Sequence, residues 1–130
     1  MKTNSFTVNN LPPQNIEAEK STLGSILLDK ESINRVIDFL RPEDFYQRPH
    51  QIIFENMIQL LEKRDPIDLL SLSNRLNEKG HLEVIGGASY LTSLVNAVPS
   101  SSHIVHYAKI VERKKILRDL ISASAEITEQ

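Results

Sequence analysis

Residues 100–130 contain neither glycine nor proline, and they read as one long helix whose apolar side changes midway. At about 100° per residue, Ile104, Tyr107, Ala108 and Val111 cluster on one face. The later apolar residues point to roughly the opposite face; they are Ile116, Leu117, Leu120, Ile121 and Ile127. A straight helix that lies on a single core keeps one apolar stripe. This helix is therefore predicted to make two different contacts, with the change of side at the charged stretch 112–115.

The second apolar stripe needs a partner, because a fully buried aliphatic side chain contributes on the order of 1.5 to 3 kcal/mol and an exposed row of them favours association. A returning helix, another copy of the chain or a different protein could cover it. A fourth reading has the last turns fray or bend back onto the rest of the chain. For Ile116, Leu117 and Leu120 we expect self-association.

The segment before residue 45 predicts two helices. Asn15 is a good N-cap, and Glu17 and Glu19 fall in the first turn, where the helix dipole favours acids. The second predicted helix ends before Pro42 and shows the i, i+3, i+4, i+7 spacing of an amphipathic helix in Ile33, Val36, Ile37 and Leu40.

Three more helices follow. The Phe45–Tyr46 pair is expected to fill the core from a loop, and a helix then starts near Pro49. Asp68 can cap the next helix, which is expected to bury Leu69, Leu72 and Leu76 and to end at Gly80. Gly86–Gly87 opens the last helix before the long one, and residues 83–85 could form a short stub of strand.

These patterns predict an all-α fold: a mobile tail over residues 1–12, a compact head of about five helices over 13–102, and the long helix over 103–130. A chain of 130 residues supports one core of this kind. Without cysteine it has neither disulfides nor a thiolate zinc site, and its longest apolar runs are too short to cross a bilayer. We expect a cytoplasmic protein with no membrane contact.

Five blocks of the sequence, in this order, resemble the N-terminal domain of the bacterial replicative DNA helicase, the DnaB family. They are PPQNIEAEKSTLGSILLD, PEDFYQRPHQIIF, DPIDLLSLSNRL, IGGASYLTSLVNAVPS and HYAKIVERKKILRDLI. The resemblance implies a helical head followed by a helical hairpin, of which residues 103–130 would be the first arm. In that family the hairpins pair into a collar on a hexameric ring, which receives primase and, in some systems, the helicase loader.

By this resemblance, Tyr90, Ile121 and Ile127 are expected to bind a partner such as primase. Tyrosine suits that role physically, since it buries a large area for two rotatable bonds and keeps a hydroxyl for the rim. An equally weighted reading makes Tyr90 a half-buried core ring. No G-x-x-x-x-G-K-[ST] run is present, so we expect no ATP hydrolysis or other catalysis here, and ATP with Mg²⁺ only in a motor domain absent from this sequence.

Other functions are weaker readings of the same residues. His103 and His106 could present two imidazoles to one metal ion, but no third ligand is evident. His50 and His81 look like surface or capping histidines. The basic group at 109–118 is interrupted by acids and is expected to be solvated and partly ion-paired rather than a DNA groove. The main alternative is a helix-turn-helix DNA-binding protein around residues 67–98, whose second helix offers one Asn and mostly apolar side chains.

Overall fold

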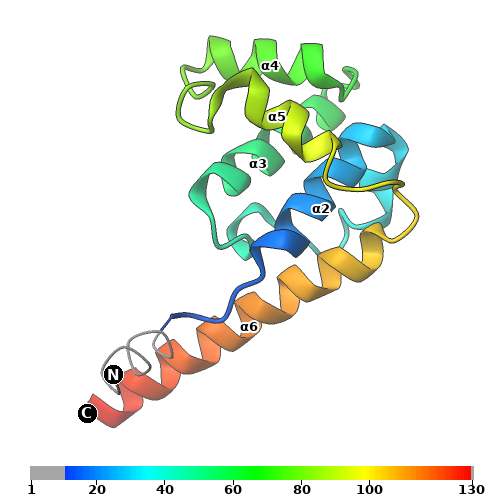
Figure 1. Cartoon of the computed structure of the whole chain (residues 1–130). Coiled ribbons are helices and arrows are strands. Elements are labelled where there is room, and N and C mark those ends of the chain that lie inside the picture. Colours follow the sequence, from blue (N-terminus) through cyan, green and yellow to red (C-terminus); the bar gives the residue numbers. More distant parts are fainter. Residues whose placement is uncertain (1–10, 130) are drawn as a thin grey trace, which may run out of the picture.

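The structure is a computed structural model that describes the backbone of residues 11–129 and the side chains of residues 11–125. Figure 1 shows a head of short helices above one long helix. The elements in chain order are α2 (Ile16–Leu28), η1 (Lys30–Arg35), η2 (Pro42–Asp44), α3 (Arg48–Glu62), α4 (Leu69–Glu78), α5 (Gly87–Val95) and α6 (Ile104–Glu129), where η marks a 3-10 helix. The predicted all-α fold is confirmed, and residues 83–85 lie in turns rather than in a strand.

Helix α2 lies at the centre of the head, where it packs against α3, α5, α6 and η1. Asn15 caps it as predicted, because its Oδ1 accepts from the backbone N–H of Ala18 at 2.9 Å. Gly24 permits the closest approach: a Cβ built there would lie 2.1 Å from the backbone oxygen of Leu94 in α5. The α2–α5 packing therefore requires a residue without a side chain at position 24.

The predicted α-helix over residues 33–40 is wrong. The chain instead forms the short 3-10 helix η1 and then turns, with Val36 at the C-cap in a non-helical conformation. The apolar spacing nevertheless identified the burial, since Ile33, Val36 and Leu40 are all buried. Burial over two tight turns produces nearly the same apolar period as an α-helix, so the period alone did not decide the backbone.

Helices α3 and α4 follow the sequence signals closely. Helix α3 begins one residue before Pro49, Asp68 caps α4 by accepting from Ser71 N–H at 2.8 Å, and Gly80 ends that helix region with a φ of 74°. Leu69 is a correction, because it is exposed at the first turn of α4 while the later leucines are buried. Arg75 ties α4 to α3 by donating from Nε and Nη2 to Gln59 Oε1 at 3.1 and 2.6 Å.

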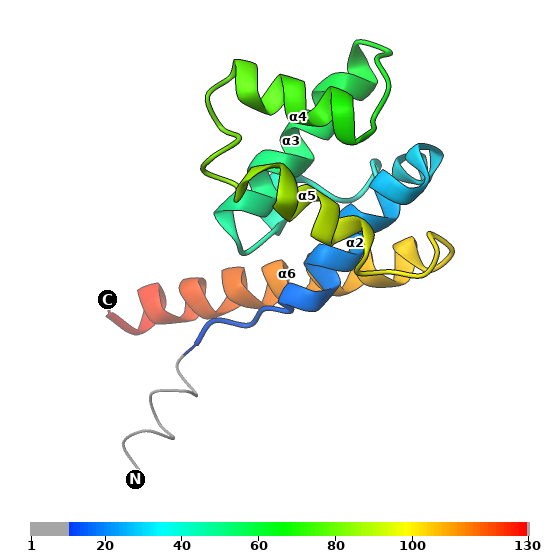
Figure 2. The same ribbon diagram turned by 45° about the horizontal axis from the view of Figure 1, so that its top comes forward.

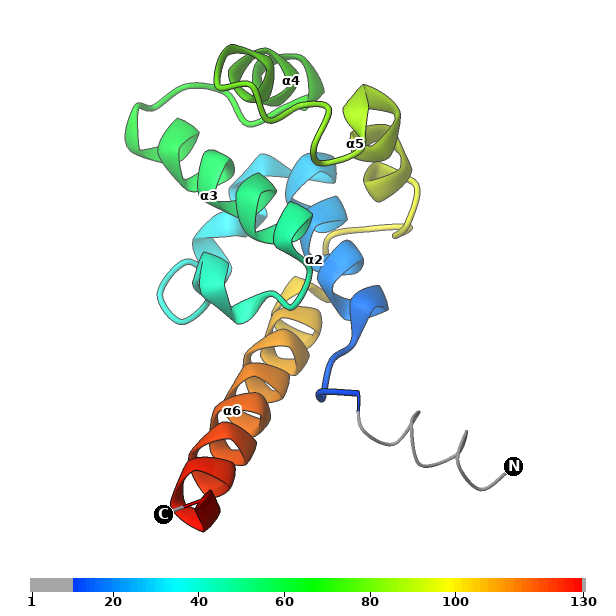
Figure 3. The same cartoon turned by 90° about the vertical axis from the view of Figure 1, so that its left-hand side faces the viewer.

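Helix α6 runs along one side of the head and then continues beyond it. Its first half contributes Ile104, Ala108 and Val111 to the core, which it shares with α2 and both 3-10 helices. The C-terminal end points away from the head in Figures 2 and 3. Within the described part of the chain, no helix is both long and apolar enough to span a bilayer.

Candidate interaction surfaces

The far half of α6 exposes a row of aliphatic side chains, as the change of side predicted. We call these four residues the α6 stripe; their exposed fractions are 50% for Ile116, 44% for Leu117, 60% for Leu120 and 56% for Ile121. The bent-back alternative is wrong, because the helix continues without interruption to Glu129. The side chain of Ile127 lies outside the described residues.

The opposite side of this half is anchored to the head by one arginine. Among the described side chains, Val111 is the last on α6 to be buried. Seven residues later, Arg118 donates from Nη1 to the backbone oxygen of Pro13 and from Nη2 to that of Asp44, both at 2.9 Å. Its guanidinium lies 5.4 Å from the centre of the Tyr46 ring. The face that is apolar near the start of α6 therefore remains in contact with the head through a cation.

This contact corrects one part of the sequence interpretation. The basic group was expected to be solvated and partly ion-paired, and the pairs Lys109–Glu112 and Lys115–Asp119 agree with that, at 3.5 and 3.1 Å. Arg118 differs, because its partners are main-chain carbonyls of two other segments. A guanidinium can serve both acceptors at once because its donors lie in a fixed fork.

Two clefts border the α6 stripe. One of about 340 Å³ lies between α6 and the segment from Phe39 to Asp44, and Ile116 forms part of its lining. The other, of about 400 Å³, lies between α6 and the start of α2; it is lined by Asn15, His106, Ile110, Arg113, Lys114 and Leu117. The stripe thus continues into hollows on both flanks, a shape that suits an inserted side chain from a partner.

Tyr90, the other predicted contact residue, is half-buried on α5. Its hydroxyl lies 2.5 Å from His50 Nε2, and the two rings are nearly parallel, with an angle of 14° between their planes. Burial raises the pKa of the Tyr90 hydroxyl above the ordinary 10.0, and the negative charges of Glu19 and Glu17 raise it further. Tyr90 is thus half-buried, as the second expectation had it, but part of its ring remains accessible to a partner.

A buried carboxylate lies behind Tyr90. Glu19 is 1% exposed, and it accepts from the backbone N–H groups of Tyr46 and Gln47 at 2.6 and 3.3 Å and from His50 Nδ1 at 2.7 Å. Glu19 lies in the first turn of α2 as expected, but its burial was not predicted. The interpretation of His50 as a surface or capping histidine is wrong, because its side chain forms a buried pair with Glu19. The missed signal is that Glu19 lies four and seven residues before Leu23 and Ile26, on the buried face of α2.

The same short segment, residues 44–47, is held from both sides. Arg118 of α6 binds it at the Asp44 carbonyl and the Tyr46 ring, and Glu19 of α2 accepts from the N–H groups of Tyr46 and Gln47. The Asp44 side chain is buried, with Oδ2 accepting from Arg41 N–H at 2.9 Å. Burial raises the pKa of the Asp44 carboxyl above 3.8 despite that hydrogen bond, and Glu43 and Glu112 add to the rise.

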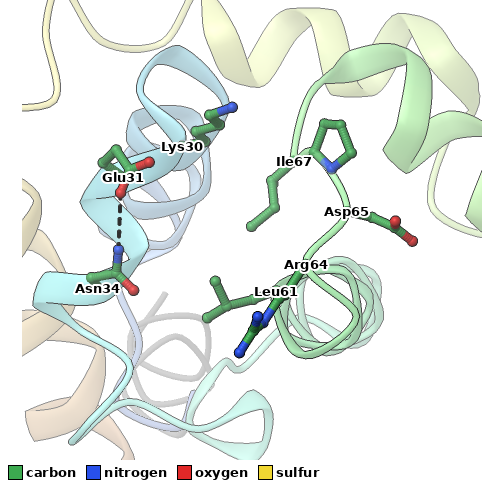
Figure 4. A pocket seen from close by; sticks show the side chains of 8 residues that line it. Lys30, Glu31, Asn34, Leu61, Arg64, Asp65 and Ile67 are labelled. Carbon is green, nitrogen blue, oxygen red and sulfur yellow. Dashed lines mark hydrogen bonds between the residues drawn. The ribbon is translucent and has the colours of Figure 1, made fainter.

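Other hollows carry no matched set of functional groups. The cleft in Figure 4, about 240 Å³ between η1 and the segment after α3, is lined by Lys30 and Arg64 together with Glu31 and Asp65, and Glu31 accepts from Asn34 at 3.2 Å. Charges of both signs at its rim favour solvation over capture of one ligand class. Among the described residues, no three of His, Cys, Asp or Glu lie close enough together to hold a metal ion. His103 and His106 are both exposed.

The geometry of α5 does not favour the helix-turn-helix alternative. Leu91 and Leu94 are buried in the core, and the exposed positions of α5 are Ala88, Ser89, Thr92 and Ser93. A recognition helix presents Arg, Lys, Asn or Gln to the base edges. The exposed face of this helix offers short side chains, and Tyr90 is its one aromatic contact residue.

Comparison with known proteins accounts for the arrangement. Residues 11–113 match the family model described as the DnaB-like helicase N-terminal domain. The replicative DNA helicase DnaC of Bacillus subtilis (strain 168) is 44% identical over 119 residues, which are 92% of this chain and 26% of that protein. The chain therefore spans about a quarter of the length of the curated relatives that it matches.

Solved structures agree with the sequence comparison. The crystal structure of the N-terminal domain of DnaB helicase from Mycobacterium tuberculosis superposes with a TM-score of 0.89 at 38% identity, covering 92% of this chain and 84% of that one. A structure of a DnaB-like replicative helicase and its interactions with primase gives 0.78 at 34% identity, covering 88% of this chain and 27% of that one. The fold, the five sequence blocks and these matches together show that the chain belongs to the family of DnaB-like helicase N-terminal domains.

Proposed function

We propose that this chain is the interaction module of a replicative DNA helicase, which joins subunits of the ring and docks other replication proteins in the cytoplasm. The exposed α6 stripe is the observation that carries the proposal. Four aliphatic side chains on one face of a projecting helix are costly in water, and their burial against another surface is the direct way to remove that cost. Ile116, Leu117 and Leu120 are assigned to self-association.

The docking partner we propose is primase, with the helicase loader as a second partner in some systems. The structurally similar helicase whose interactions with primase have been determined supports this choice. Tyr90 and Ile121 are the described contact residues, and Ile127 is proposed with them from the sequence resemblance. The proposed role involves no ATP hydrolysis and little direct DNA contact: ATP and Mg²⁺ would act in a separate motor domain of the full-length helicase, and this domain would transmit contacts to it.

The self-association test compares two aspartates on opposite sides of α6. Leu117→Asp places a charge within the stripe, whereas Ser122→Asp adds the same charge about 140° away around the helix. Absolute mass by light scattering after size exclusion should show a concentration-dependent dimer or larger species for the wild type and for Ser122→Asp. Leu117→Asp should be monomeric with unchanged helical circular dichroism. A wild type that stays monomeric at high concentration would refute self-association.

Docking is tested by capture of an isolated primase C-terminal domain, measured by isothermal titration calorimetry. Tyr90→Ala and Ile121→Ala should each weaken capture by about tenfold or more if they anchor the contact. Thr92→Ala, on an exposed position of the same helix as Tyr90, is the matched control and should bind as the wild type does. Equal capture by all four proteins would place the docking site elsewhere.

A further inference from the structure

Glu19 is an unusual residue for the interior of a small helical head, because burying a carboxylate is costly unless donors surround it. Its three donors come from two sources: the main chain at Tyr46 and Gln47, and the ring of His50. The side chains of Glu19 and His50 are both 2% exposed, so neither can touch a partner protein. The pair is nevertheless connected by hydrogen bonds to groups that are accessible to a partner protein.

Toward α5, the connection passes through His50. The Glu19 carboxylate can only accept, so Nδ1 donates to it; a neutral imidazole then presents Nε2 as the acceptor for the hydroxyl of Tyr90 at 2.5 Å. Because Tyr90 turns about only two side-chain bonds, one fixed hydroxyl position defines where its ring lies on the surface. The orientation of the Tyr90 ring therefore depends on the hydrogen bond between its hydroxyl and the buried His50 ring.

Toward α6, the connection passes through the main chain of residues 44–47. Glu19 fixes the N–H groups of Tyr46 and Gln47, and Arg118 binds the Asp44 carbonyl and lies over the Tyr46 ring. Beyond the buried residue Val111, Arg118 is the side chain that joins this half of α6 to residues 44–47. The direction of the α6 stripe relative to the head depends on the place of this segment.

We propose that Glu19 is a positioning residue for both docking surfaces, orienting Tyr90 through His50 and the α6 stripe through residues 44–47. The proposal rests on the function proposed above. It assigns to one inaccessible carboxylate a role in two binding events, and it predicts that a change at this residue alters capture of primase and self-association together.

The test uses Glu19→Gln, which keeps the size and removes the charge. The Gln oxygen must face the short Tyr46 N–H bond, so its NH₂ group faces His50 Nδ1 and can only donate. His50 must then carry its proton on Nε2 and donate to Tyr90. Nitrogen-15 spectra of the imidazole ring should show a protonated Nδ1 in the wild type and an unprotonated Nδ1 in the variant. Glu78→Gln removes the same charge from an exposed position of α4, a helix that carries neither docking surface, and is the matched control.

In Glu19→Gln the NH₂ group takes the place of Oε1, so it can no longer accept from Gln47 N–H or from His50 Nδ1. Capture of the primase C-terminal domain and self-association should therefore each weaken by about fivefold, the loss expected for one poorly made hydrogen bond. Tyr90→Phe, which deletes only the hydroxyl, should weaken capture by about the same factor and leave self-association unchanged. Since both substitutions break one chain of contacts, the double variant should capture the primase domain no more weakly than the weaker single variant. Glu78→Gln should match the wild type in both assays.

The outcomes separate the two proposals. If Tyr90→Ala and Leu117→Asp leave both interactions intact, the proposed function fails and the positioning role falls with it. If those variants act but Glu19→Gln behaves like Glu78→Gln, or if the losses in the double variant multiply, only the positioning role is rejected. Should Glu19→Gln lose its helical circular dichroism, Tyr90→Phe decides: capture equal to that of the wild type would overturn the proposal.

Discussion

The two halves of α6 contact the same head through different interactions: the first half by apolar burial and the second by hydrogen bonds. The first half presents Ile104, Ala108 and Val111, which are fully buried. On the same side, the second half presents Arg118, whose two hydrogen bonds and ring contact hold the helix without burying apolar surface. The difference teaches that a helix can stay attached to its domain while its aliphatic residues turn outward, because polar anchoring frees the apolar face for another molecule.

The largest expected contrast is between aliphatic truncations in the two halves. Ile104→Ala should lower the free energy of unfolding by about 2 to 5 kcal/mol, because it leaves a cavity in a closed core. Leu120→Ala, at a side chain 60% exposed, should change the stability of the monomer by less than about 0.5 kcal/mol. Urea denaturation at low protein concentration measures both. Equal losses would mean that the second half is also packed against the head.

A second contrast compares a close helix contact with a free helix surface. Gly24→Ala inserts a Cβ against the Leu94 carbonyl oxygen and should cost about 1 to 3 kcal/mol, because α2 and α5 must separate. Ser122→Ala on the exposed part of α6 should be neutral or slightly stabilising, since alanine favours helix. Thermal unfolding of the two variants checks the difference. A Gly24→Ala protein as stable as the wild type would show that this contact yields easily.

The third contrast concerns the polar anchor itself. Arg118→Ala should lower stability by about 1 kcal/mol, a value reduced by the partial exposure of the guanidinium, whereas Arg113→Ala should have no measurable effect. Arg118→Lys should restore only part of the loss, because an ammonium lacks the planar fork that reaches two carbonyls. The measurement is the midpoint of urea unfolding. Full rescue by lysine would show that the positive charge alone, and not the shape of the guanidinium, stabilises this contact.

The smallest expected effect is a pH dependence of stability that comes from the carboxyl of Asp44, the residue whose main-chain oxygen accepts from Arg118. Because burial raises the pKa of Asp44 in the folded state, the folded chain holds this proton more tightly than the unfolded chain does. The resulting stability is fully present below pH 3.8 and is lost as the pH rises through the raised pKa. Relative to the wild type, Asp44→Asn should therefore gain stability between pH 3 and pH 7, as measured by urea midpoints. A difference that is constant with pH would contradict this.

Sequence reasoning predicted most of the fold because its signals were local. Asn15, Asp68 and Gly80 each set a helix end through their own backbone or side chain, and the change of apolar side on α6 needed only helical geometry. It predicted the wrong backbone for residues 33–40, since 3-10 turns and an α-helix bury residues at similar spacings.

The candidate site was predicted less completely, because its contacts join distant parts of the chain. Glu19 and His50 are 31 positions apart, His50 and Tyr90 are 40 apart, and Arg118 reaches back to Pro13 across 105. The α6 stripe could be named from periodicity, but nothing local indicates which carbonyl an arginine will bind. The contact roles of Tyr90, Ile116, Leu117, Leu120, Ile121 and Ile127 remain predictions for the experiments above.

The acceptors of Arg118 have a consequence for redesign. A carbonyl oxygen belongs to every amino acid, so the bond to position 13 survives any replacement there that keeps the path of the main chain. Position 13 could therefore be substituted, for example to attach a fluorophore, while Arg118 continues to hold the second half of α6 to the head. Of the two groups in this hydrogen bond, only the donor, the Arg118 side chain, depends on the amino acid present.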